Sequence, residues 1–530
     1  MKLNPRGLTL AILGALCTMC TLPAAAAQDA DIDSVRAATS KLISQLVEQG
    51  VLTRDKGSAL LDEVSKPAAA PKGSAAAGSS KSAGATPGTV RVPYIPEYVR
   101  NEMKEEIRLE LAAQAFREGW TGPNSVPAWV RNMEWEGDLR MRTQLDRFAS
   151  GNATNIYDIN STNSNRAITL LNSTEDRDRL RFRARLGMTV KIDENWSGGF
   201  RLATGSANDP LSSNQTLGNF ENRYTVLADR AYIRYRYADQ FNVVMGRFGN
   251  PWFSTDMMWA NDLSFDGVAA QWTPAITPDW RGFVTLGALP VQEVQLSSAD
   301  KWLLGAQVGA TLSGSPQDIR AKVGLAYYSY KNMEGELSPA GSTANEFTAP
   351  QFVQKGNTYY QISSDPTRPL YGLAAEYQLI DLTGQIDFPS YAGKRLIFTG
   401  DYARNVGFNS NDVTARTGLV VDGETGATSN VDGQVNAYHV RAAFGDVDLK
   451  KAHDWQVFVA YKRVERDAVL DAFTDSDFHL GGTDTRGYIL GGSYGVAKNT
   501  YLTFRYLSAD EISGPPLGID VFQFDLNVKF

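Results

Sequence analysis

The chain has 530 residues, of which 43% are hydrophobic and 10% aromatic, and its formal charge at pH 7 is −7. So mild a charge on so long a chain argues against a nucleic-acid partner. Beyond the first 27 residues no apolar run reaches the roughly 18 residues of a transmembrane helix. Length alone would suggest several soluble domains, but one large membrane barrel accounts for it better, because only alternate strand residues of a barrel meet lipid.

The first 27 residues are typical of a secretory signal peptide. Lys2 and Arg6 form a short positive region, residues 8–22 are apolar but too few to span a bilayer, and alanines occupy positions 24–27 before the expected cleavage site. Both cysteines, Cys17 and Cys20, lie in this segment. We therefore expect the mature chain to have no disulfide, no thiolate metal site and no cysteine nucleophile.

Residues 28–131 divide into three segments, and we expect all three to lie in the periplasm. Apolar residues recur at spacings of three and four within residues 28–65, which predicts a periplasmic helical segment. Residues 66–90 consist mainly of Ala, Gly, Ser, Pro and Lys and form a flexible linker. Residues 91–131 hold an amphipathic helix and the lead-in to the next segment. This helix either packs beneath the barrel or forms a short coiled coil between subunits.

From residue 132 to residue 530 the hydrophobic period changes to two, which predicts an outer-membrane β-barrel. Between positions 181 and 186, for example, arginines alternate with apolar residues, so one face of the strand is charged and the other apolar. The fold class is thus an all-β transmembrane barrel of about 16 antiparallel strands with an N-terminal periplasmic helical extension. The predicted strand centres lie near residues 140, 184, 200, 231, 245, 268, 285, 308, 324, 375, 399, 440, 459, 490, 503 and 525.

The lengths of the connections support the barrel independently. Long and short connections alternate strictly, as expected when extracellular loops are long and periplasmic turns are short. A sandwich of stacked sheets would not be expected to alternate long and short connections. The same alternation places both ends of the barrel in the periplasm. The long connections are predicted at residues 148–176, 207–223, 250–262, 291–302, 331–370, 406–433, 467–484 and 510–519, and the short ones near 194, 238, 275, 315, 385, 449 and 497.

The last strand ends on an aromatic residue, Phe530. Alternate residues from Phe522 to Phe530 are all apolar, whereas the residues between them are mostly polar. A strand of a soluble sandwich would alternate in the same way, but few soluble domains end on an exposed Phe. The ending resembles the terminal strand of bacterial outer-membrane barrels, which implies that Phe530 is an assembly signal for the barrel assembly machinery.

Several motifs resemble those of the uncharacterised "putative porin" family of proteobacterial outer-membrane proteins. The resemblance covers most of the first half of the chain, and the second half agrees only in strand pattern and final Phe. It implies a pore, names no solute and offers no catalytic residues. The matching stretches are Leu46–Thr53, Val92–Glu97, Trp135–Arg142, Asn214–Gly218, Asp229–Tyr232, Gly246–Pro251 and Phe265–Ala270.

Arginines on the polar faces of the first strands are the strongest functional candidates. If the apolar faces meet lipid, these side chains must face the lumen, where they would attract anions. The alternative is that they pair with Glu136, Asp138, Asp229 and loop acids to brace the wall, and both roles can hold together. The predicted pore-lining residues are Arg140, Arg142, Arg181, Arg183, Arg185, Arg201, Arg230, Tyr232, Arg234 and Arg236.

The third long connection, residues 250–262, is unusually apolar for a surface loop. Its large apolar side chains would be costly to leave in water. We expect the loop to fold into the lumen, although a contact between subunits is the alternative. The residues predicted to form this constriction loop are Trp252, Phe253, Asp256, Trp259 and Asp262, with the two aspartates as constriction acids.

Other chemical motifs are weak. The stretch Gly491–Gly495 matches the hydrolase elbow pattern around Ser493, but it lies within an alternating strand rather than at a strand–helix turn. The three histidines are spread over separate elements, so neither a zinc site nor a catalytic triad is expected. Four aspartates at 471, 475, 477 and 484 could hold a divalent cation or bridge lipopolysaccharide through one, but solvated loop acids are the default.

We therefore expect an outer-membrane porin that passes small hydrophilic solutes passively, with a preference for anions as one outcome. A substrate-specific channel, or a structural protein tethered through its periplasmic helices, is the alternative. An energised receptor is disfavoured because the barrel is too short for about 22 strands. The expected partners are outer-membrane lipid and lipopolysaccharide, the assembly machinery, the solutes, and two further copies if a homotrimer forms. No enzyme activity, cofactor or metal is expected.

Overall fold

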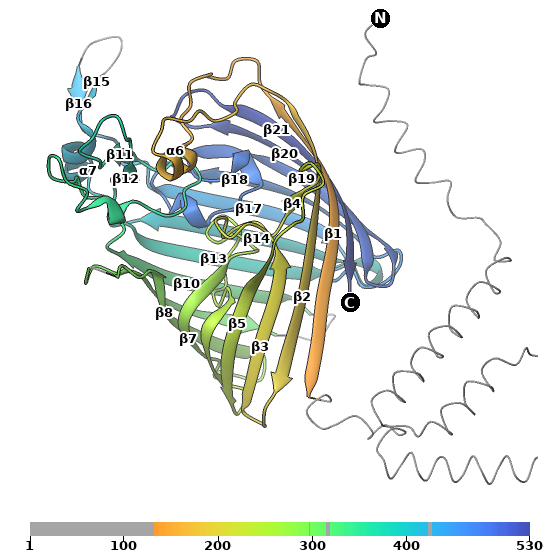
Figure 1. Cartoon of the computed structure of the whole chain (residues 1–530). Helices are drawn as coiled ribbons and strands as arrows, with labels where there is room; N and C mark the ends of the chain where they lie inside the picture. Colours follow the sequence, from red (N-terminus) through yellow and green to blue (C-terminus); the bar gives the residue numbers. More distant parts are fainter. Residues whose placement is uncertain (1–131, 296, 314–317, 422–426) are drawn as a thin grey trace, which may run out of the picture. The chain divides into compact units, whose positions relative to one another are not determined.

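The computed structural model describes residues 132–295, 297–313, 318–421 and 427–530 (Figure 1). The predicted signal peptide (1–27), helical segment (28–65), linker (66–90) and amphipathic segment (91–131) lie outside the described residues. Of the helices among the described residues, none is long and apolar enough to cross a membrane.

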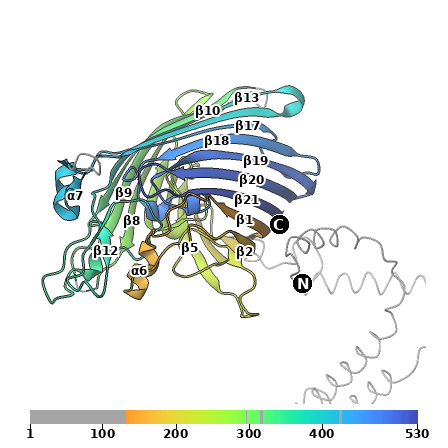
Figure 2. The same cartoon turned by 90° about the horizontal axis from the view of Figure 1, so that it is seen from above.

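Sixteen antiparallel strands form the wall of a closed barrel, and each pairs with its neighbours in chain order (Figure 2). A further two-residue strand, β4 (Gln215–Thr216), pairs with Arg181 and Phe182 in the first half of β2. The wall strands are β1 (Met133–Phe148), β2 (Arg177–Lys191), β3 (Trp196–Thr204), β5 (Val226–Tyr237), β6 (Phe241–Gly249), β7 (Ser264–Trp272), β8 (Trp280–Gln292), β9 (Lys301–Leu312), β10 (Arg320–Lys331), β13 (Gln378–Pro389), β14 (Arg395–Asn405), β17 (Asn436–Gly445), β18 (Trp455–Val464), β19 (Thr485–Ala497), β20 (Thr500–Glu511) and β21 (Gly518–Lys529).

The barrel closes where β1 meets β21. The register runs from Asp138 opposite Lys529 to Phe148 opposite Ile519. Beyond it, Gly137 and Phe530 exchange two backbone hydrogen bonds, at 2.9 and 3.0 Å. The pairing of the first and last strands closes the wall, as a lipid environment requires.

The alternation that predicted the strands separates an apolar outer face from a largely polar inner face. Val457 and Val459 of β18 are 50% and 46% exposed on the outside, whereas Lys462 of the same strand is 2% exposed. On β21, Phe524 is 51% exposed and Gln523 only 1%. The prediction of a transmembrane barrel of about 16 strands is confirmed for the described residues.

The tenth strand was predicted too early in the chain. Its predicted centre near 375 precedes β13, and the predicted short connection near 385 lies within that strand. Residues 371–373 instead form β12 (Tyr371–Leu373), which pairs with β11 (Tyr359–Gln361) in the preceding connection. Ala374, Ala375 and Tyr377 are completely buried. These residues are apolar because they pack inside the barrel, and for this reason the segment was mistaken for a wall strand.

Long connections gather at one end of the barrel (Figure 1). They carry the helices α6 (Ile159–Asn165) and α7 (Ser410–Thr417) and the small hairpin β15 (Val420–Val421) and β16 (Thr428–Ser429). Asp158 caps α6 by accepting a hydrogen bond from the Ser161 amide. Short 3-10 turns occur at η2 (Glu346–Thr348), η3 (Tyr391–Gly393), η4 (Asp471–Phe473) and η5 (Phe478–Leu480).

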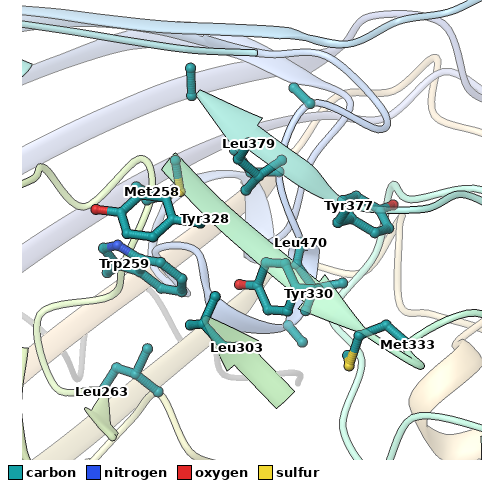
Figure 3. Close-up of a cluster of buried hydrophobic side chains, with 14 of the residues drawn as sticks. Met258, Trp259, Leu263, Leu303, Tyr328, Tyr330, Met333, Tyr377, Leu379 and Leu470 are labelled. Carbon is teal, nitrogen blue, oxygen red and sulfur yellow. The ribbon is translucent and has the colours of Figure 1, made fainter. Parts of the chain in front are cut away.

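Three of the long connections fold together into a hydrophobic core inside the barrel. We name them loop 250–263, loop 332–377 and loop 465–484. Trp259 of the first packs edge-on against Tyr328 of β10, with ring centroids 5.3 Å apart, and Leu470 of the third is 2% exposed (Figure 3). Tyr330 and Phe473 stack at 6.4 Å. Apolar side chains therefore fill much of the interior beside β6–β10 and β13.

Candidate functional site in the barrel interior

The inner face of β1 and β2 carries two facing rows of arginines. In the strand register Arg140 lies opposite Arg183, and Arg142 lies opposite Arg181. Adjacent like charges destabilise a sheet unless carboxylates separate them. Arg142 binds Asp525 of β21 through two hydrogen bonds, at 2.7 and 2.9 Å. The arrangement of this wall therefore depends on acids from neighbouring strands.

Part of the arginine set braces the wall. Arg183 and Arg185 both bind Asp138, at 2.8 and 2.7 Å, and both also bind Asp262 of loop 250–263, at 3.3 and 2.9 Å. Although burial opposes ionisation, the two guanidinium groups lower the pKa of Asp262 below its ordinary value. On the next strands Arg201 forms an ion pair with Asp229.

Other arginines have little compensation among the described residues. Arg181 donates to the Gln144 amide oxygen at 3.2 Å and forms no ion pair. Arg230 donates to the Ser264 hydroxyl at 3.2 Å, and Arg234 lies over the Tyr232 ring with 5.2 Å to its centroid. Arg140 and Arg236 of the predicted set also belong to this group. The carboxylate of Asp525 lies 4.0 Å from Arg140, and Arg236 is exposed near the short turn after β5.

Loop 250–263 runs across the interior and is fixed at several points. The Thr255 amide and hydroxyl donate to Asp401 of β14, at 3.1 and 2.5 Å. Phe253 and the Gln307 side chain of β9 exchange two hydrogen bonds, at 2.8 and 2.7 Å. Since Asp262 binds arginines of β2, the loop connects opposite parts of the wall. Trp252 and Trp259 are 5% and 2% exposed, so they anchor the loop in the core.

Asp256 occupies the middle of that loop and binds the far wall. Its carboxylate lies 2.8 Å from Lys462 of β18 and 4.0 Å from His439 of β17. Burial favours the neutral carboxyl, but the Lys462 and His439 charges outweigh it and lower the pKa of Asp256 to about 2. Asp256 is therefore held as a carboxylate within the interior.

Loop 465–484 brings further acids into the barrel. Asp477 binds Arg142 at 2.9 Å and Arg505 at 2.5 Å, and these cations outweigh burial to hold its pKa well below the ordinary value. Asp475 lies 3.4 Å from Lys462. The expectation of solvated acids in this loop is wrong, since Asp471 and Asp484 are 0% and 1% exposed. The loop is buried because its apolar residues pack inside the barrel. Among the described residues no group of acids or histidines is arranged to hold a metal.

The sequence candidates came from the first strands and missed cations and acids of the last ones. Lys462, Arg505 and Asp525 lie on inner faces, and their strands show the same two-residue alternation. Extending the pattern to β18–β21 would have found them. The two-residue pattern, however, does not predict which acid of a loop pairs with which cation of the wall.

The hydrolase-like motif has no elbow geometry. Ser493 lies in the middle of β19, and its hydroxyl hydrogen-bonds that of Thr503 on β20 at 2.9 Å. A nucleophile elbow needs a sharp turn between a strand and a helix. This serine therefore joins two wall strands.

A closed sixteen-stranded barrel with an apolar outer face and a charged interior defines an outer-membrane channel protein. The sequence profile of a family described as "Putative porin" matches residues 36–530. The chain belongs to this family, is located in the cell outer membrane and contacts its lipid. The resemblance found in the sequence motifs is thereby confirmed.

The chain is similar to several solved outer-membrane proteins at low sequence identity. Pseudomonas putida OprB at high pH is 15% identical, with a TM-score of 0.42 over 76% of this chain and 95% of that one. The outer-membrane channel DcaP of Acinetobacter baumannii is 8% identical, with a TM-score of 0.39 over 75% and 97%. Salmonella typhi OmpF in complex with daunomycin is 9% identical, with a TM-score of 0.38 over 75% and 97%. No curated protein matches the sequence.

Proposed function

We propose that this porin passes small hydrophilic solutes by passive diffusion and prefers anions. The observation that carries the proposal is the imbalance on the inner face of β1–β5. Arg181, Arg230 and Arg234 form no ion pair among the described residues, whereas Asp138, Asp146 and Asp229 of this wall are already bound by arginines. Uncompensated cations on a low-dielectric wall raise the local concentration of anions.

The hydrophobic core fills the interior beside β6–β10 and β13, so we place the solute path on the opposite side, along the arginines of β1–β5. Loop 250–263 would narrow this path with Asp256 and Asp262, while Trp252, Phe253 and Trp259 hold the loop against the wall. A basic wall facing loop carboxylates sets a transverse field, so charge as well as size would select the solutes. The family and the fold point to a channel rather than an enzyme.

The test is ion selectivity in planar bilayers. Arg181, Arg230 and Arg234 are changed together to Gln, and the reversal potential is measured in a salt gradient at low ionic strength. The potential should shift toward cations, because three uncompensated charges are lost while the wall acids keep their partners. The matched control is Arg147→Gln, since Arg147 binds Asp178 at 2.7 Å on the rim of β1. Equal reversal potentials in the triple variant and the wild type would rule out the anion preference.

A substrate-specific channel is the second candidate function. The aromatic ring of Tyr232 beneath the Arg234 guanidinium favours it, because such a pair offers a charged group and an apolar face to one solute. Saturation of transport with rising solute concentration would distinguish it from passive diffusion, in which flux stays proportional to concentration. The remaining alternative, a structural protein tethered through its periplasmic helices, depends on residues 28–131, which lie outside the described residues.

We also propose a homotrimer, formed through the outer face of β3–β7. An apolar hollow of about 740 Å³ lies there, bordered by Gly198, Phe200, Ile233 and Val268. It suits apolar side chains of a neighbouring subunit. Gly198→Leu should convert trimers to monomers in native mass spectrometry, since a Cβ at Gly198 meets nothing closer than 3.7 Å within the subunit. Gly384→Leu on the outer face of β13 is the matched control, and trimers that persist in Gly198→Leu would exclude this interface.

A further inference from the structure

A cavity of about 250 Å³ lies inside the barrel at the end that carries the long connections. Its walls come from β6–β9 near that end and from loops 250–263, 332–377 and 465–484. Leu263, Leu289, Leu303 and Phe473 form its apolar part, and the three leucines are at most 3% exposed. A partly enclosed cavity with both apolar and charged walls has the features of a site for a small organic molecule.

Lys301 supplies an uncompensated charge to this cavity. It is the first residue of β9 and is 1% exposed. Its ammonium donates to the backbone oxygens of Thr348 and Ala349, at 3.0 and 3.1 Å. An ammonium has three donors, so one is left for a further partner. Carbonyl oxygens satisfy hydrogen bonds but bring no negative charge, and a buried cation without a counter-charge is costly.

The acids on the cavity wall do not neutralise Lys301. Asp266 is bound by Arg247 at 2.8 Å. The carboxyl group of Asp471 accepts the Tyr359 hydroxyl at 2.8 and 2.9 Å, and burial raises its pKa to about 7, so its neutral form is favoured below that pH. Among the described residues no carboxylate forms an ion pair with Lys301. Lys301 is therefore a buried cation whose natural complement is an anion from outside the described residues.

The size of the cavity limits what that anion can be. A cavity of about 150 Å³ accommodates benzene, so the volume of about 250 Å³ has room for a ring or a short branched chain together with a carboxylate. The leucines and Phe473 would contact the apolar body of such a molecule. A small inorganic anion would fill only part of the space and leave the apolar wall without a partner.

We infer that this cavity is a binding site for a small organic carboxylate with an apolar body, held by an ion pair with Lys301. The inference rests on the proposed channel function. If the arginines of β1–β5 attract anionic solutes, the cavity would bind a solute of this class. Benzoate represents the class, and benzamide is its neutral counterpart of nearly equal shape.

The experiment measures binding of benzoate and benzamide to the full-length protein in detergent by isothermal titration calorimetry. Wild-type protein should bind benzoate saturably and benzamide at least about tenfold more weakly, because the ion pair is absent. Lys301→Met should weaken benzoate binding by about tenfold or more, and Lys301→Arg, which keeps the charge, should retain most of it. The comparison of benzoate with benzamide needs no variant, so it holds even if Lys301→Met does not fold.

Lys322→Met is the matched control. Lys322 lies on the inner face of β10, with Nζ 4.3 Å from the Phe253 ring centroid, and does not line the cavity. It should leave benzoate affinity unchanged. Equal affinities for benzoate and benzamide, equal losses in the two methionine variants, or no saturable binding would each overturn the inference. Bilayer conductance is measured on the same samples, so a failure of channel activity is distinguished from a failure of this site.

Discussion

Arg142 and Asp525 face one another across the seam that closes the barrel, with Arg142 Nε 2.7 Å from the nearer carboxylate oxygen. The two side chains are 2% and 6% exposed. Arg142 also binds Asp477 of loop 465–484. One guanidinium thus joins the first strand, the last strand and an inserted loop, so closure of the wall and packing of the interior are linked.

Asp525→Asn should destabilise the folded barrel. It removes one of the two carboxylates that bind Arg142 and leaves Asp477 alone. Leaving a buried charge without any partner costs about 3 to 5 kcal/mol, so the loss here should be smaller than that. The temperature at which the barrel loses its compact form on electrophoresis should fall. Asp178→Asn, which removes an exposed partner of Arg147 at the rim, is the control and should have little effect. An unchanged transition in Asp525→Asn would show that the seam does not depend on this pair.

Deleting Phe530 should reduce the amount of folded protein in the outer membrane without blocking export across the inner membrane. The residue contributes two backbone hydrogen bonds to Gly137 at the seam, and its ring is 63% exposed and available to the assembly machinery. Fractionation with an antibody against the protein measures both pools. Phe530→Tyr, which keeps the terminal aromatic ring, is the control. Wild-type yield of the deletion would contradict the role of Phe530 in assembly.

The wall of the barrel was predictable from the sequence because each strand repeats one simple physical requirement. Residues facing lipid must be apolar and residues facing inward need not be, so a two-residue period marks strands such as β18 and β21. Strand β13 was misplaced because the apolar residues of loop 332–377 serve an internal core rather than lipid. Hydrophobicity alone cannot distinguish these two destinations.

The interior was less predictable because its contacts join distant parts of the chain. The Trp and Met residues of loop 250–263 indicated burial, and Val469, Leu470 and Phe473 carried the same signal in loop 465–484, where it was overlooked. The pairing of Asp256 with Lys462 depends on two separately placed elements. A single sequence offers no local pattern for such a pair.

Changing Arg181, Arg183 and Arg185 together to Gln should leave a barrel that assembles but shifts its permeability toward cations. Two of these arginines neutralise Asp138 and Asp262, so their loss uncovers two carboxylates in addition to removing three positive charges. The shift in reversal potential should shrink between about 0.01 and 1 M salt, where the screening length falls from about 30 to about 3 Å.

Adding Asp262→Asn to that triple variant should reverse part of the shift, since it removes one of the uncovered charges. Adding Asp178→Asn at the rim instead is the matched control and should reverse little of it. If Asp262→Asn and Asp178→Asn had the same effect, the selectivity would reflect total charge rather than charges of the interior.

Protonation of Asp471 should stabilise the packing of loop 465–484. The carboxyl is completely buried beside the Tyr359 hydroxyl, with Asp467 and Lys355 as its charged neighbours, and burial raises its pKa from 3.8 to about 7. A raised pKa means that the contribution of this group to stability is fully present below about pH 4 and is lost as pH rises toward about 7. The thermal midpoint of the wild type relative to Asp471→Asn should therefore fall between pH 5 and pH 8, because the amide does not titrate. Asp448→Asn, in the exposed turn before β18, controls for removing an acid as such. A constant difference between wild type and Asp471→Asn over this range would show that Asp471 does not titrate there.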